Sequence, residues 1–122
     1  MGDRRRGRWP TEGRLEQMHR ERYAGVAVDP VPLTAGEEVT VLYQGLLAEK
    51  GAEQVWLHVG YGPADRWENV TDYAMEKTGW GWVKKLRVED AGRFNFCFHD
   101  NANNWDNNGG LNWSYEVHHG AL

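Results

Sequence analysis

The sequence predicts an all-β fold, an immunoglobulin-like antiparallel β-sandwich. Short segments after residue 31 alternate apolar and polar residues with the period of a β-strand. Turn-forming residues separate these segments, and the chain of 122 residues contains 15 glycines. Several short strands at this spacing are typical of two packed sheets, and the chain is long enough for one such domain.

Five strands are predicted, four of them by an apolar residue at every second position. The core-facing residues of the first, second, fourth and fifth strands are Val39, Val41 and Tyr43; Val55, Leu57 and Val59; Phe94, Phe96 and Phe98; and Leu111, Trp113, Tyr115 and Val117. The third strand is expected within residues 79–88. The alternation turns Trp56 and His58 away from the core on the second strand, and Cys97 and His99 on the fourth.

The first 30 residues are expected to form a separate tail. Residues 1–23 contain seven arginines and four acidic residues, so their net charge is +3. Residues 11–23 offer a weak helix with few apolar side chains, and prolines at positions 30 and 32 interrupt any regular element. We therefore expect residues 1–30 to be a basic tail, disordered or weakly helical and dispensable for ligand binding. Residues 31–122 should form the β-sandwich domain.

A loop before the last strand holds one tryptophan among amides and glycines. In residues 103–110, Trp105 is the only aromatic residue, and the asparagines and glycines around it suit backbone conformations with positive φ. Such a loop gives an indole little apolar cover. Trp67 also lies in a polar segment, residues 64–69. Most of the seven tryptophans must be structural in a domain of this size, and Trp80, Trp82 and Trp113 are assigned to the core or its edge. Exposed aromatic residues that gather on one surface indicate binding, so we expect Trp67 and Trp105 to be exposed together.

These segments resemble the signature of starch-binding modules, the carbohydrate-binding module families 25 and 53. The resemblance is carried by the Trp-Asp-Asn-Asn loop at residues 105–108, with residues 96–100 before it and 112–115 after it. A strand histidine followed by Gly-Tyr at residues 58–61, and then Trp67, is a second part of it. Met75 and the Gly-Trp-Gly-Trp segment at residues 79–82 complete the match, which covers roughly residues 36 to 118.

The resemblance implies a set of sugar-binding residues. They are His58, Trp67, Trp105, Asp106, Asn107 and Asn108. The two tryptophans would stack on adjacent glucose rings, and His58 would hydrogen-bond to sugar hydroxyls. Two roles stay open for the loop residues 106–108, namely contact with hydroxyls and capping of the loop's own backbone. Whether Trp56 and His99 contribute also stays open, since His99 stands where this signature has asparagine.

The implied function is non-catalytic binding of an α-glucan: starch, glycogen or a maltooligosaccharide. An enzyme is not expected, because the single serine, Ser114, lies within a strand and no cationic group is evident to activate Cys97. No cofactor or metal is expected either. The only cysteine excludes an internal disulfide and a cysteine zinc site, and the loop around Trp105 lacks the final glutamate of a calcium loop. The alternative is an interaction domain that binds a protein, or a polyanion through the arginine-rich segment.

Charge and hydropathy limit the other partners. Residues 24–122 contain seven basic and 14 acidic side chains, a net charge of −7 that argues against nucleic acid. No apolar run is long enough for a membrane span, and the first residues lack a secretory signal, so a cytoplasmic location is expected. The oligomeric state stays open.

Overall fold

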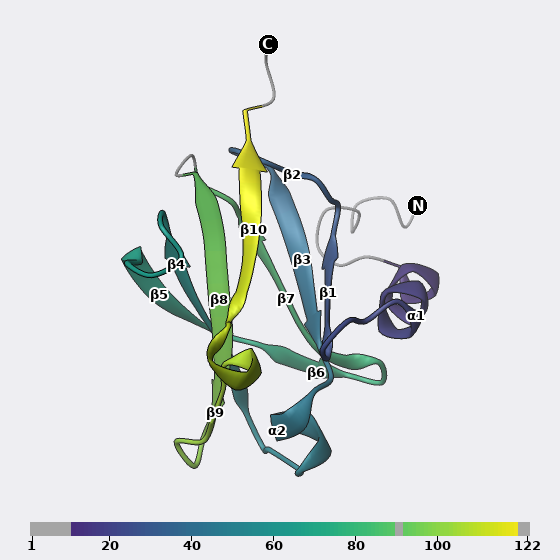
Figure 1. Cartoon of the computed structure of the whole chain (residues 1–122). Coiled ribbons are helices and arrows are strands. Elements are labelled where there is room, and N and C mark those ends of the chain that lie inside the picture. Colours follow the sequence, from purple (N-terminus) through teal and green to yellow (C-terminus); the bar gives the residue numbers. More distant parts are fainter. Residues whose placement is uncertain (1–10, 90–91, 120–122) are drawn as a thin grey trace.

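The structure of the chain is a computed structural model that describes residues 11–89 and 92–119. Two β-sheets pack face to face, and their inner faces enclose the core (Figure 1). The predicted all-β sandwich is therefore confirmed. No helix within the described ranges is both long and apolar enough to cross a membrane.

The first sheet has the strand order β1-β3-β7-β6. Its strands are β1 (Val26–Asp29), β3 (Glu38–Tyr43), β7 (Gly81–Arg87) and β6 (Glu76–Thr78). Every neighbouring pair in this sheet is antiparallel. Two helices flank the sandwich, α1 (Glu12–Arg20) and the short α2 (Leu46–Glu49).

The second sheet has the strand order β2-β10-β8-β4-β5. Its strands are β2 (Leu33–Thr34), β10 (Trp113–His118), β8 (Arg93–Asp100), β4 (Val55–Tyr61) and β5 (Glu68–Ala74). A two-residue strand, β9 (Trp105–Asp106), pairs with one end of β8, and a 3₁₀ turn, η2 (Asn108–Gly110), follows it. β2 and β10 are parallel, whereas the other pairs are antiparallel.

The five predicted strands correspond to β3, β4, β7, β8 and β10. The three phenylalanines of β8 are fully buried, and Phe98 stacks on Tyr43 of the opposite sheet with ring centroids 3.9 Å apart. Trp82 and Trp113 are buried as expected. The prediction for Leu111 is wrong, because β10 begins two residues later and the side chain is 79% exposed.

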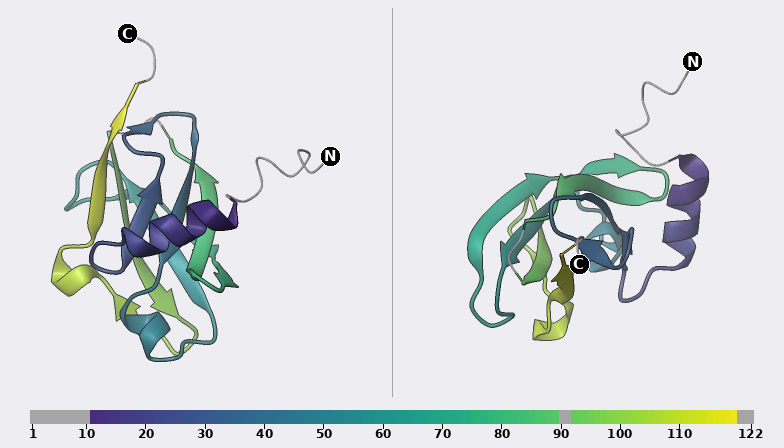
Figure 2. Two further views of the ribbon diagram at one scale, coloured as in Figure 1. Left: turned by 90° about the vertical axis from the view of Figure 1, so that its right-hand side faces the viewer. Right: turned by 90° about the horizontal axis from the view of Figure 1, so that it is seen from above.

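The N-terminal segment differs from the expected separate tail. β1 pairs with β3 along its whole length, and its first residue, Val26, is buried in the core. Helix α1 crosses the outer face of the first sheet (Figure 2), where Leu15 and Met18 are buried against Leu42 and Val83. The expected boundary at residue 30 thus lies just after a strand of the sandwich; residues 1–10 lie outside the described residues.

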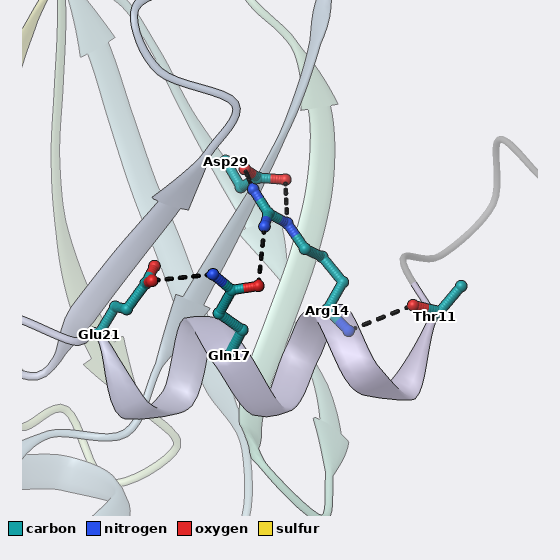
Figure 3. A network of polar contacts seen from close by, with 5 residues as sticks. All are labelled: Thr11, Arg14, Gln17, Glu21 and Asp29. Carbon is teal, nitrogen blue, oxygen red and sulfur yellow. Dashed lines mark hydrogen bonds and ion pairs between the residues drawn. The ribbon is translucent and has the colours of Figure 1, made fainter.

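Polar contacts hold α1 against β1. Arg14 of the helix forms an ion pair with Asp29 at the end of the strand, and its Nε atom donates to the same carboxylate at 3.1 Å (Figure 3). Gln17 accepts from Arg14 and donates to Glu21, so the network runs along one side of the helix. Thr11 caps the helix by accepting from the backbone N–H of Arg14. The helix is therefore held against the sheet by apolar burial and by the ion pair of Arg14 with Asp29.

Candidate functional site

Five rings gather on the face of the second sheet that is turned away from the core. They belong to Trp56, His58, Trp67, His99 and Trp105, which we call the aromatic cluster. Trp56 and His58 lie on β4 and His99 on β8, where the pleat turns these alternate residues outward. Trp67 comes from the turn after β4, and Trp105 from β9. The cluster thus joins segments far apart in the sequence.

His58 lies between the two tryptophans that the sequence indicated. Its ring centroid is 6.0 Å from that of Trp67 and 5.1 Å from that of Trp105, with the second pair nearly perpendicular at 88°. Trp105 is 46% exposed, and Trp67 is half-buried. The structure therefore brings three of the expected site residues together on one accessible surface.

Gly60 makes room for Trp67 over β4. A Cβ atom at this glycine would lie 2.6 Å from the Cβ and Cε3 atoms of Trp67, far inside van der Waals contact. The indole Nε1 atom donates to the carbonyl oxygen of Ala64 at 2.8 Å, which fixes the ring against its own turn. Trp67 can therefore pack closely over Gly60, which has no side chain, and the hydrogen bond to Ala64 fixes the orientation of its ring.

Replacing Gly60 with alanine should displace Trp67 and weaken binding at this surface by about tenfold, or about 1.4 kcal/mol. The effect is steric, because no left-handed backbone conformation is involved at Gly60. Binding is measured by titration with maltoheptaose. Gly79→Ala is the matched control, since nothing lies within 4 Å of its Cβ position. Equal affinities for the two variants would show that the position of Trp67 does not matter.

The other indole, that of Trp105, rests on His99. Trp105 pairs with His99 across β8 and β9, and the two ring centroids are 4.4 Å apart. The preceding turn is organised by the Asp100 carboxylate, which accepts from the backbone N–H groups of Asn104 and Ala102. These hydrogen bonds, that of Asn104 first, lower the pKa of Asp100. The turn that presents Trp105 is thus built on an ionised carboxylate.

The polar residues after Trp105 hydrogen-bond within the protein. The Asp106 carboxylate accepts from the Tyr43 hydroxyl at 2.6 Å, and burial together with this bond raises the pKa of that tyrosine. The Asn107 side chain accepts from the backbone N–H of Gly110 at 3.0 Å. Asn108 donates to the carbonyl oxygen of Asn112 at 3.2 Å. Asp106 also accepts from the backbone N–H of Asn108 at 3.2 Å, so all three side chains bond to backbone groups of the loop, as the capping role requires.

Asp72 is a member of the site that the sequence did not indicate. It lies directly opposite His58 in the β4–β5 pair, and its Oδ1 atom is 2.6 Å from Nδ1 of His58. Partial burial acts to raise the pKa of Asp72, but the hydrogen bond with His58 and the approach of His99 outweigh it and lower that pKa. If β5 had been predicted, its pairing with β4 would have placed Asp72 opposite His58 and so indicated it as a site residue.

His99 and Trp56 extend the cluster beyond the expected three rings. Their rings stack with centroids 5.3 Å apart and planes 7° from parallel. Cys97, which lies opposite His58 in the β4–β8 pair, is buried, and burial raises the pKa of its thiol to about 11. Trp105 also borders a hollow of about 480 Å³, which is lined by residues of α2 and of the turn after it, by residues 100–102 and by Asn104.

Residues 39–96 match the sequence model of the starch/carbohydrate-binding module, family 53. The resemblance to starch-binding modules is therefore confirmed over these residues. The matched range includes His58 and Trp67, whereas Trp105 lies beyond it and joins them through the pairing of β9 with β8. No curated protein and no solved structure matches the chain.

Proposed function

We propose that the aromatic cluster of this module binds α-glucan, as starch, glycogen or a maltooligosaccharide, and catalyses no reaction on it. The observation that carries the proposal is the position of His58 between Trp67 and the exposed Trp105 on one face of the second sheet. The family match supports starch-like polysaccharide as the ligand class.

The geometry suits the chemistry of a helical α-glucan. Its glucose rings expose apolar CH faces along a curve, with hydroxyls at the rim, and indoles can stack on such faces. Two indoles on either side of an imidazole contact neighbouring rings of the sugar, and the imidazole supplies the hydrogen bond that fixes their orientation. His58 is oriented for this by Asp72, because the Nδ1 atom of its ring is occupied by the carboxylate.

The loop residues act mainly through Trp105 in this proposal. Asp106 and Asn108 are half-buried and hydrogen-bonded within the loop, whereas Asn107 is exposed. Asn107 is thus the best placed of the three to reach a sugar hydroxyl. Trp56, stacked on His99, extends the platform along β4.

Replacing Trp105 with alanine should weaken glucan binding by about 5- to 150-fold, or about 1–3 kcal/mol, by analogy with other flat ligands that stack on aromatic side chains. The fold should persist, because the side chain is 46% exposed. Affinity electrophoresis in gels containing glycogen or starch, together with titration of maltoheptaose, measures the effect. A thermal melt verifies that the variant is folded.

Tyr23→Ala is the matched control, because Tyr23 is 85% exposed and is not part of the aromatic cluster. It should bind glucan as the unchanged chain does. Equal losses in both variants would contradict the proposed platform. Absence of retardation of the unchanged chain, with binding to a protein or a polyanion instead, would favour the interaction domain.

A further inference from the structure

Three potential metal ligands meet beside the aromatic cluster. They are Nδ1 of His58, Oδ1 of Asp72 and Nε2 of His99, which all lie within 4.8 Å of one another. The side chains come from the adjacent strands β4, β5 and β8. We propose that His58, Asp72 and His99 bind one divalent transition-metal ion, and that Zn²⁺ fits them best.

The distances are close to those of a zinc coordination sphere. Zinc bonds to nitrogen and carboxylate oxygen of about 2.0–2.1 Å place the ligand atoms of a tetrahedron about 3.3 Å apart. In the structure, Oδ1 of Asp72 lies 2.6 Å from Nδ1 of His58 and 3.2 Å from Nε2 of His99. The three atoms all lie within 4.8 Å of one another, so an ion would require side-chain rotations that widen the contact between His58 and Asp72. The ion would take the place of the hydrogen between His58 and Asp72.

One of the three atoms lacks a hydrogen bond. Nε2 of His99 is buried and, although it is within ion-pair distance of Asp72, it is not aligned for a hydrogen bond and has no other partner. A buried polar atom without an aligned hydrogen bond is costly, because it has lost its interaction with water and the nearby Asp72 carboxylate replaces that interaction only in part. Coordination to a metal ion would satisfy this nitrogen.

The donor set selects the kind of ion. Two imidazoles and one carboxylate suit Zn²⁺ and related transition metals, whereas Ca²⁺ and Mg²⁺ prefer six or more oxygen ligands. Three protein ligands leave a coordination position for water. Asp72 is exposed, so an ion could enter from solvent. The inference does not depend on glucan binding, because it rests on these three side chains alone.

A bound ion would also act on the aromatic cluster. It would fix the ring of His58, which lies between the two tryptophans, and the ring of His99, on which Trp105 rests. The metal would therefore be a structural support for the exposed surface. Its loss would loosen Trp105 without unfolding the sandwich, because the core on the other face of β4 and β8 does not involve these side chains.

The test is a Co²⁺ titration of the full chain, purified without a histidine tag and dialysed against a chelator. We expect visible absorption bands of low-coordinate Co²⁺ that saturate at one ion per chain and are displaced by Zn²⁺ but not by Ca²⁺. Zinc should also raise the Tm in proportion to the logarithm of its concentration above the Kd. Elemental analysis after dialysis against Zn²⁺ gives the stoichiometry independently.

Asp72→Asn and His99→Ala should each weaken metal binding by at least tenfold, with unchanged far-ultraviolet circular dichroism. His118→Ala is the control, because this exposed histidine at the end of β10 lies outside the three ligands. Equal metal binding by all three variants would overturn the proposal. Loss of binding only in the His118→Ala variant would place the ion at the C-terminal histidines instead, and no saturable binding would leave Asp72 as a hydrogen-bond partner of His58 alone.

Discussion

A chain that begins at residue 31 is expected to lose several kcal/mol of its free energy of unfolding. The deletion removes three buried side chains, Leu15, Met18 and Val26, each worth about 1.5–3 kcal/mol by burial. Ordering the segment offsets part of this gain, but the whole stability of a domain is only about 5–15 kcal/mol. The deletion also uncovers Leu42 and Val83 and frees the edge of β3. Urea unfolding followed by tryptophan fluorescence measures the loss, and aggregation is expected at high protein concentration.

A chain that begins at Thr11 is the matched control, since it keeps every described residue of α1 and β1. Its urea midpoint is the reference from which the loss caused by removing α1 and β1 is measured. If the chain beginning at residue 31 is as stable as this control, then α1 and β1 contribute nothing net, and the tail expected from the sequence is the better description.

Replacing Trp82 with alanine should destabilise the module by about 3–5 kcal/mol, the usual cost of removing a large aromatic side chain from a core. Trp82 is 4% exposed and packs within the main hydrophobic cluster, opposite Tyr43 in the β3–β7 pair. The Tm should fall by about 10–20 °C in a domain of this length. Calorimetry measures the change.

Trp105→Ala is the natural comparison, because it removes the same side chain from the surface. Its Tm should change little while its glucan affinity falls. Similar losses of Tm in the two variants would show that Trp105 is a structural residue, and the division between core and displayed tryptophans would fail.

The sequence predicted the strands whose apolar residues alternate without interruption. β4 and β8 are of this kind, and their outward residues carry most of the aromatic cluster. β5 gave no such pattern, because all of its residues except Tyr73 are exposed. Because β5 was not predicted, its pairing with β4 could not be predicted either. The position of Asp72 beside His58 therefore remained unknown. The short strands β2 and β9 are too brief for any periodic signal.

The packing of α1 was missed for a different reason. Its only buried residues, Leu15 and Met18, are too few to demand burial by themselves. The sequence signal for this packing lies in β3 and not in the helix. Leu42 interrupts the alternation of β3, because it places an apolar side chain on the outward face of the strand. An apolar residue at an outward position requires a cover, and α1 provides it.

The parts of the site that could be predicted are those in which the neighbouring residues in the sequence determine whether a side chain faces solvent. Polar surroundings correctly indicated that Trp105 is exposed, and strand alternation placed His58 outward. Trp67 was also expected to be exposed, but it is half-buried and packs against the core cluster. The detailed partners of residues 106–108 depend on where the loop meets Tyr43 and Asn112, which distant parts of the chain decide. Such contacts have no local signature.

The position of the cluster within its sheet has a mechanical consequence. β4 and β8 are interior strands, each hydrogen-bonded to a neighbour on both sides. The rings of His58 and His99 are therefore attached to a rigid part of the sheet. Trp67 packs closely over Gly60, and Trp105 lies on β9, which is hydrogen-bonded to β8. A surface assembled this way is preorganised, and little conformational entropy is left for a ligand to remove. The protein surface would keep its shape on binding. A flexible ligand would therefore have to adopt the conformation that is complementary to this surface.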